Sequence, residues 1–573
     1  MPLTLVLLLL VTLNGVASEN LLLTTDRQTG NQKSEIPGTN QQSGRISDSV
    51  PNSGNLDVEE PLLYGFFPAG FLWGAATSAL QVSDQPDMES SPENTCQCVS
   101  LICFVIHTTV SQRHIMMRML VCCLVVQGAG SDMLKPNLQV EGWGDDDRGL
   151  AGCEYHFILS SFTIEIGLTP IDLSYEGDVW AQEAGHVTDG SDASKAADSF
   201  HKWREDLALV KTFSLNTYRL SISWPRVLPQ GTGQPSAEGL AYYRGILQEC
   251  QRLGISPLVT LSHFDMPANL ELEAGGWLNP DSVSWFLHFA RTCFTELGDL
   301  VPRWITFNEP LVTAFQGYET GVWPPGLKER PGQDLYLVAR HILLAHASTY
   351  ALYHQELGLP GQVGITLNSN WFEPKTEEEV EAAERSLQFY FGLFAAPLVF
   401  GIWPPMVEER VRERSFAQGF NISRLPAWSG EEQEQLRATF DFLGLNTYST
   451  SLVANHNFSL QEVSAVSDMG VAFSSSSSWF TSAAGLGVVP AGIRRLLAWV
   501  SREYGNPPVI VTENGVCDRL GNLDDMERVY YYKHYINQVD FSPFLQTFAG
   551  VEGNHIGQLQ RYWICRLEPF GQL

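Results

Sequence analysis

A chain of 573 residues can bury a large core, and a composition that is 44% hydrophobic and 11% aromatic suits one large globular domain or two ordinary ones. This composition excludes collagen-like and broadly disordered proteins. The formal net charge of -29 argues against nucleic acids and anionic membrane surfaces as partners, because a strongly negative surface repels phosphate.

The N-terminal region predicts a secreted protein. Residues 1–18 hold an apolar run that is short for a membrane span, followed by Val16, Ala17 and Ser18, whose small side chains suit signal-peptide cleavage. The alternative is a buried N-terminal helix. Residues 19–60 are rich in Ser, Asn, Gly, Gln, Thr and Asp, which predicts a disordered leader. We therefore expect the folded domain within residues 61–573, with no evident membrane anchor.

Strand-like and helix-like segments alternate through most of this domain. The expected strands are Phe71–Ala79, Asn216–Trp224, Ser256–Phe264, Arg303–Pro310, Gln362–Asn368, Phe440–Thr450 and Pro508–Asn514. Strands that alternate with helices predict an α/β fold with a parallel sheet, here a (β/α)8 TIM barrel. The tail, residues 540–573, offers no convincing eighth strand, so we expect the barrel to be incomplete at strand eight.

Two stretches interrupt this alternation. Residues 83–138 form an atypical insertion after the first strand, with five of the ten cysteines: Cys96, Cys98, Cys103, Cys122 and Cys123. The Cys96 and Cys98 pair lacks the second pair of ligands that a zinc site needs, and no disulfide can be assigned. Residues 150–177 form a second atypical stretch.

Two of the expected strands carry a glutamate at their C-terminal end. Glu309 lies near the end of RWITFNEP and Glu513 near the end of PPVIVTENG, so both side chains are expected at the barrel mouth, where parallel strands end. Two carboxyl groups about 5 to 5.5 Å apart are what a retaining glycosidase requires. Arg219 could keep one carboxylate ionised, because a fixed cation lowers a carboxyl pKa. Tyr448 could donate a hydrogen bond to it, and Asn308 could hold a sugar hydroxyl.

A set of motifs in a fixed order resembles family 1 glycoside hydrolases, the β-glucosidase and lactase-phlorizin hydrolase group, and most of all the lactase and klotho branch. The motifs are FLWGAATSALQ, YRLSISWPRVLP, TLSHFDMP, ITFNEP, GYETG, FDFLGLNTYS and VIVTENG. The resemblance implies Glu309 as acid/base and Glu513 as nucleophile. It also implies Gln81, His263 and Asn308 as sugar-binding residues and Tyr448 and Arg219 as residues that orient the nucleophile. It implies hydrolysis of β-glucosides or β-galactosides with no metal and no cofactor.

The chain departs from the family pattern at three places. Phe264 replaces the tryptophan of the usual HWD motif. The family runs directly from its strand-one glutamine into VEGAW, whereas here the insertion follows Gln81, and QVEGWG begins only at Gln139, a weaker rival for the same role. The family segment WSLLDNFEW, which forms strand eight and binds outer sugar hydroxyls, has no counterpart after Asp540.

Three functions follow from these observations. The first is a retaining β-glycosidase of the secretory pathway, extracellular or associated with the cell surface. The N-x-S sequons at Asn421 and Asn457 agree with secretion and predict surface loops. The second is a catalytically impaired klotho-like protein that binds a protein receptor, an alternative motivated by the missing strand. The third is an aberrant product that does not close its barrel, since unpaired strand edges favour aggregation.

Overall fold

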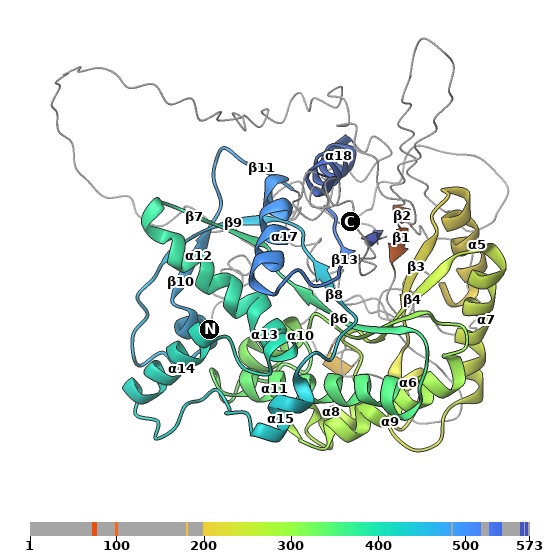
Figure 1. The fold of residues 1–573 in the computed structure, drawn as a ribbon, viewed down its shortest axis with the longest axis horizontal. Helices are drawn as coiled ribbons and strands as arrows, with labels where there is room; N and C mark the ends of the chain where they lie inside the picture. Colours follow the sequence, from red (N-terminus) through yellow and green to blue (C-terminus); the bar gives the residue numbers. More distant parts are fainter. Residues whose placement is uncertain are drawn as a thin grey trace, which may run out of the picture.

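Eight parallel strands close into a barrel in the order β1-β14-β13-β8-β6-β5-β4-β3, with helices packed around it (Figure 1). The computed structural model describes residues 72–76, 98–100, 179–180, 199–482, 485–516, 526–540, 562–566 and 568–570. The barrel strands are β1 Leu72–Ala76, β3 Thr217–Ser221, β4 Ser256–Ser262, β5 Arg303–Asn308, β6 Gln362–Asn368, β8 Phe442–Asn446, β13 Val509–Glu513 and β14 Tyr562–Arg566. The expected TIM barrel is therefore present, and each strand predicted from the sequence overlaps one of these.

The eighth strand corrects the expectation of an incomplete barrel. Strand β14 pairs in parallel with all five residues of β1 and with Ile510 and Val511 of β13. The segment Tyr562–Arg566 is short and lies in a mixed stretch without periodicity, so its pattern did not indicate a strand. Strands β1 and β13 would otherwise leave unpaired backbone groups at two edges, and β14 pairs with both of these edges.

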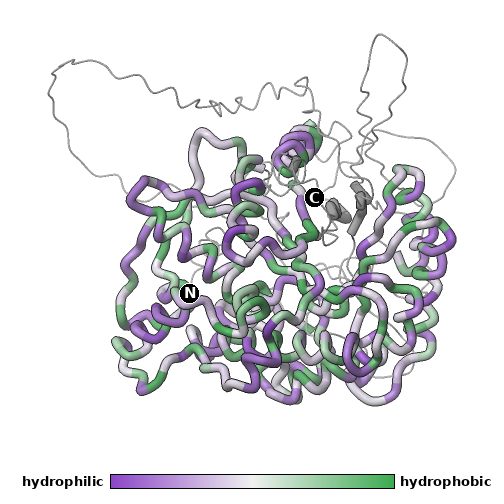
Figure 2. Tube along the Cα trace, in the orientation of Figure 1, coloured by the Kyte–Doolittle hydropathy of each residue, from purple (hydrophilic) through white to green (hydrophobic). Residues whose placement is uncertain are grey.

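The buried hydrophobic side chains form two separate clusters. Leu258, Ile305, Phe442 and Ile510, from β4, β5, β8 and β13, form a small buried cluster separate from the main core. Alternate residues of a barrel strand face opposite sides of the wall, so an inner cluster and an outer one are expected. The larger cluster contains side chains from both the strands and the helices. Hydrophobic and hydrophilic residues alternate along the helices (Figure 2).

Helices connect successive barrel strands. They are α5 Ser199–Thr212, α6 Trp224–Val227, α7 Ala237–Leu253, α8 Ala268–Leu272, η2 Gly276–Leu278, α9 Ser282–Leu297, α10 Pro310–Val312, η3 Thr313–Thr320, α11 Asp334–Ala351, η4 Leu352–Glu356, η5 Glu377–Glu379, α12 Val380–Leu387, η6 Gln388–Gly392, α13 Leu393–Phe400, α14 Pro405–Ala417, α15 Gly430–Leu436, α16 Ala465–Met469, α17 Ala491–Glu503 and α18 Met526–Asp540. Helix α7 shows how sequence sets the ends: the Ser236 side chain accepts from Gly239 N, and Gly254 ends the helix in a left-handed conformation.

Short strands lie outside the barrel. They are β2 Cys98–Ser100, β7 Trp371–Pro374, β9 Thr450–Asn455, β10 Val471–Ser474, β11 Phe480–Thr481, β12 Gly487–Val488 and β15 Glu568–Phe570. Strand β2, within the predicted insertion, pairs antiparallel with β15 of the tail. The predicted signal peptide, leader, second atypical stretch and the rest of the insertion lie outside the described residues.

No single helix among the described residues is long and apolar enough to cross a membrane. The bent pair Glu377–Phe400 and Pro405–Ala417 reaches the necessary length and apolar composition only when its two helices are taken together.

Candidate active site

Glu309 lies directly after β5 with an unusual backbone. Its φ and ψ of 46° and 60° are left-handed, a conformation that residues other than glycine rarely adopt, and Pro310 then begins α10. Non-glycine residues held in this region are concentrated at functional sites. The preceding Asn308 is buried, whereas Glu309 is half-buried. The strand-end position predicted for both residues is confirmed.

Glu513 ends β13 and is almost fully buried. Its side chain is 1% exposed and accepts a hydrogen bond at Oε1 from Arg219 Nη1 at 2.8 Å, while the Tyr448 hydroxyl donates to Oε2. The register of β13 against β8 shifts between Val511 and Glu513, a bulge of the kind that changes the direction of a side chain. A cation on one oxygen and a hydroxyl donor on the other both favour the ionised form of a buried carboxylate.

Arg219 joins four strands through one guanidinium group. Besides Glu513, its Nη1 donates to Thr512 O at 3.3 Å, its Nη2 to Asn308 Oδ1 at 2.7 Å, and its Nε to Thr260 Oγ1 at 3.2 Å. Each donating nitrogen therefore has a fixed acceptor on β4, β5 or β13. The predicted pairing of Arg219 with the Glu513 carboxylate is present, and the same residue also orients Asn308.

His263 follows β4 and contacts Asn308. The distance from Asn308 Nδ2 to His263 Nε2 is 3.1 Å. An amide nitrogen only donates, and Asn308 Oδ1 already accepts from Arg219, so Nε2 must accept. His263 is therefore a neutral imidazole protonated on Nδ1, which brings it into the same network.

Asp265 holds the turn that carries His263. It is 2% exposed and accepts backbone hydrogen bonds from His263 N at 2.9 Å and Trp224 N at 3.3 Å. Burial raises the pKa of Asp265 to about 7, although these two amides lower it. Between the two residues, Phe264 has a φ of 63°, and its ring meets the edge of Trp323 with centroids 6.1 Å apart. Phe264 thus contacts the ring of Trp323 and occupies the position of the tryptophan in the HWD motif.

Asn446, the last residue of β8, was not predicted as a site residue. It is 1% exposed, and its Nδ2 donates to Glu309 Oε1 at 2.5 Å and to Asn308 Oδ1 at 3.1 Å. Its Oδ1 accepts from the Thr512 hydroxyl at 2.7 Å. The available signal was its strand-end position in the motif FDFLGLNTYS, two residues before Tyr448.

Helix α18 supports Tyr448 from outside the barrel. The hydroxyls of Tyr531 and Tyr535 donate to Tyr448 O at 2.7 and 3.2 Å, and their rings stack with centroids 3.9 Å apart. Asn514 Nδ2 donates to Tyr531 OH at 2.9 Å and to Thr447 O at 2.6 Å. These contacts fix the loop that presents the Tyr448 hydroxyl to Glu513, and they too were missed by sequence reasoning.

All predicted site residues in the described ranges thus belong to one network. Gln81 and its rival Gln139 lie outside the described residues, so their predicted role in sugar binding stays a prediction. Among the residues that the structure describes, no group of three or more His, Cys, Asp or Glu is arranged to hold a metal ion.

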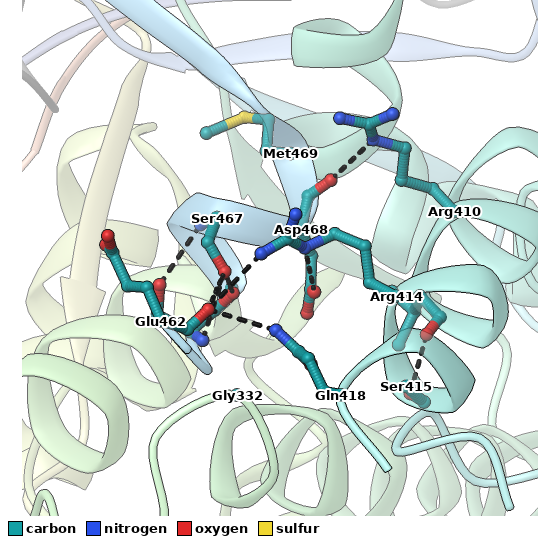
Figure 3. A network of polar contacts seen from close by, with 12 residues as sticks. Gly332, Arg410, Arg414, Ser415, Gln418, Glu462, Ser467, Asp468 and Met469 are labelled. Carbon is teal, nitrogen blue, oxygen red and sulfur yellow. Dashed lines mark hydrogen bonds and ion pairs between the residues drawn. The ribbon is translucent and has the colours of Figure 1, made fainter. Parts of the chain in front are cut away.

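A second polar cluster joins α14 to the segment around α16 (Figure 3). Arg410, Arg414 and Gln418 reach from α14 and its end to the segment of Glu462 and Asp468: Arg410 Nε donates to Asp468 O at 2.8 Å, and Gln418 Nε2 to Glu462 O at 3.0 Å. The Asp468 carboxylate is buried and accepts from Arg424, also buried, at 2.5 and 2.7 Å.

Glu319 connects this cluster to the segment that begins at Glu309. It lies on η3, which continues from α10 and hence from Glu309. Its Oε2 accepts from Gly332 N at 2.6 Å and its Oε1 from Ala465 N at 2.7 Å. The segment that begins at Glu309 is therefore tied to two other loops through one buried carboxyl group.

The titration of Glu319 should appear in the stability of the protein. Burial raises the pKa of Glu319 from 4.5 to about 7, so the folded state binds more protons than the unfolded state between these values. The contribution of the protonated group to stability is complete below about pH 4.5 and is lost as the pH rises through about 7. We expect the free energy of unfolding to lose about 3 kcal/mol over this window through Glu319 alone, and Glu319→Gln to lack that component.

Denaturant titrations between pH 4.5 and 8 check this expectation. The matched control is Glu413→Gln, on an exposed position of α14, which should keep the pH dependence of the parent. Identical pH dependence in Glu319→Gln and in the parent would show that Glu319 does not bind a proton on folding.

Comparisons with known proteins place the chain. The model of glycosyl hydrolase family 1 matches residues 174–544. Lactase/phlorizin hydrolase of Homo sapiens is 34% identical over 515 residues, which cover 88% of this chain and 22% of that protein. Beta-glucosidase 25 of Oryza sativa subsp. japonica is 36% identical over 423 residues, or 67% of this chain and 81% of that protein.

A solved structure resembles the fold as well. A mutant of rice Os3BGlu6 beta-glucosidase in a covalent complex with Glc has a TM-score of 0.66 at 26% identity, covering 88% of this chain and 90% of that chain. Against the lactase/phlorizin hydrolases of human and rat, this chain spans 22% of their length.

Proposed function

Because this chain belongs to glycosyl hydrolase family 1, we propose that it is a retaining β-glycosidase that hydrolyses β-glucosides or β-galactosides by double displacement. Its substrate is a small-molecule or oligosaccharide β-glycoside. The observation that carries the proposal is the single network that joins the two strand-end glutamates: Arg219 binds Glu513 and Asn308, and Asn446 binds Asn308 and Glu309.

The first step uses both glutamates. The ionised Glu513 attacks the anomeric carbon while Glu309 gives its proton to the glycosidic oxygen, so that the aglycone leaves as a neutral alcohol or phenol. A covalent glycosyl ester on Glu513 results. The ion pair with Arg219 and the hydroxyl of Tyr448 support this assignment, because they favour an ionised nucleophile and fix its position.

The second step reverses the roles at Glu309. Now ionised, it takes a proton from water, whose oxygen attacks the anomeric carbon and displaces Glu513, so that the sugar leaves with its original configuration. The half-buried position of Glu309 supports the assignment, since water must reach it, whereas Glu513 is 1% exposed. His263 and Asn308 are proposed to bind hydroxyls of the sugar ring.

Trapping with a mechanism-based 2-deoxy-2-fluoro glycoside tests this function. We expect mass spectrometry to find a glycosyl adduct on the peptide that contains Glu513. The covalent Glc complex of the rice relative supports the choice of probe. A folded chain that forms no adduct and releases no aglycone from aryl β-glucosides would refute the proposal.

The secretory location is part of the proposal, and the sequons test it. Asn421 and Asn457 are both exposed, which places both acceptors within reach of an oligosaccharyltransferase. Expressed in animal cells, the chain is expected in the medium or at the cell surface, with peptide N-glycosidase lowering its mass by two glycans. Asn421→Gln and Asn457→Gln should each remove one glycan; a chain with none retained in the cytosol would contradict secretion.

The receptor-binding alternative rested on the missing strand-eight segment of the family. Strand β14 takes the place of that strand between β1 and β13, although its sequence is not that of the family segment. The same pairing removes the reason to expect an aberrant chain with an open barrel. Both strand-end glutamates are present in one hydrogen-bonded network, which favours the hydrolase.

A further inference from the structure

We infer that Asn446 is a positioning residue for the proposed acid/base Glu309. Its amide nitrogen donates to Oε1 of Glu309, and its amide oxygen accepts from Thr512 on β13, the strand that carries Glu513. The inference rests on the proposed function. Asn446 and Glu309 are 137 residues apart in sequence. In the structure, the distance from Asn446 Nδ2 to Glu309 Oε1 is 2.5 Å.

The orientation of the Asn446 amide follows from its neighbours. Its Nδ2 faces two oxygens, Asn308 Oδ1 and Glu309 Oε1, and its Oδ1 faces the Thr512 hydroxyl at 2.7 Å. A flipped amide would place its oxygen against both acceptors. Asn308 Oδ1 also accepts from Arg219, so the observed orientation is the one in which every group donates or accepts correctly.

This orientation has a consequence for proton transfer. An N–H group that points at Oε1 makes this oxygen an acceptor whether Glu309 is neutral or ionised, so the proton of the neutral acid resides on Oε2. Proton transfer to a leaving group depends on where that one oxygen lies. The left-handed backbone at Glu309 increases this dependence, because the conformation must be maintained by surrounding contacts.

The amide also connects the two halves of the proposed mechanism. Thr512 precedes Glu513 on β13, its hydroxyl donates to Asn446, and its carbonyl accepts from Arg219. Asn446 is 1% exposed and Thr512 is fully buried, so water does not compete for these bonds. The positions of the two carboxyl groups are thereby coupled through β8.

The test compares leaving groups. General acid catalysis is needed for a phenyl β-glucoside, whereas 2,4-dinitrophenolate leaves without a proton. We expect Asn446→Ala to lower the single-turnover release of phenol by about 10- to 100-fold and that of dinitrophenol by only a few-fold. Thr512→Val, which removes the anchor of the amide, should act in the same direction more weakly. Thr349→Val, which removes a buried hydroxyl without a hydrogen-bond partner among the described residues, should match the parent.

Two results would overturn the inference. Equal losses with both leaving groups in a folded Asn446→Ala protein would indicate a general structural role, and no loss with either would remove any role. If the parent releases neither phenol, the proposed hydrolase is wrong, and ¹³C NMR of the labelled Glu309 carboxyl then decides. Its titration should move to higher pH in Asn446→Ala, because the lost N–H favoured the ionised form; unchanged titration would refute the contact.

Discussion

Replacing Glu513 with alanine is expected to lower kcat/KM for an aryl β-glucoside by about 10⁴-fold or more, because the atom that attacks the anomeric carbon is then absent. Steady-state rates on a purified chain measure the loss. Azide should restore turnover, since a small anion fits where the carboxylate was. It attacks from the face that Glu513 used, so the product should be the α-glycosyl azide, which NMR distinguishes from the β anomer.

The same substitution has a second effect that must be separated from catalysis. It leaves the Arg219 guanidinium buried without its carboxylate, and removal of one partner of a buried ion pair costs about 3 to 5 kcal/mol of stability. Circular dichroism therefore has to show that the variant is folded. Azide rescue is the sharper control, because an unfolded chain cannot respond to it. A folded Glu513→Ala protein with the parent's activity would show that Glu513 is not the nucleophile.

Strand periodicity predicted most of the barrel because the rule behind it is local. Buried parallel strands are short apolar runs separated by helices, and Gln362–Asn368 was predicted with the bounds that the structure has. Strand β14 could not be predicted this way. It is stabilised by two edges formed by β1 and β13, far away in sequence, and not by any pattern within Tyr562–Arg566.

The candidate site divides in the same manner. Glu309 and Glu513 were predictable because strand ends meet at one face of a barrel, whatever their separation in sequence. Arg219 and Glu513 lie 294 residues apart, and the resemblance to the family supplied their pairing. Asn446 was missed because it lies inside the predicted strand Phe440–Thr450, and only its three partners in the structure identify its role.

Replacing Glu309 with alanine is expected to produce a loss that depends on the leaving group. For phenyl β-glucoside, kcat/KM should fall by about 10³-fold or more, because the aglycone must leave without a proton. For 2,4-dinitrophenyl β-glucoside the first step should be nearly unaffected, and hydrolysis of the glycosyl enzyme should become rate-limiting because no base activates water. Stopped-flow measurement should then show a burst of dinitrophenol followed by slow turnover.

Azide separates the two glutamates by the configuration of the product. In Glu309→Ala it replaces water in the second step and attacks the glycosyl enzyme from the face opposite Glu513, so the β-glycosyl azide should form. Glu319→Gln offers a comparison on the same segment, since it removes a carboxyl group that binds the backbone of Gly332 and Ala465. Neither azide rescue nor a burst is expected for this variant. A β product from Glu309→Ala and an α product from Glu513→Ala would assign both roles, whereas the reverse would exchange them.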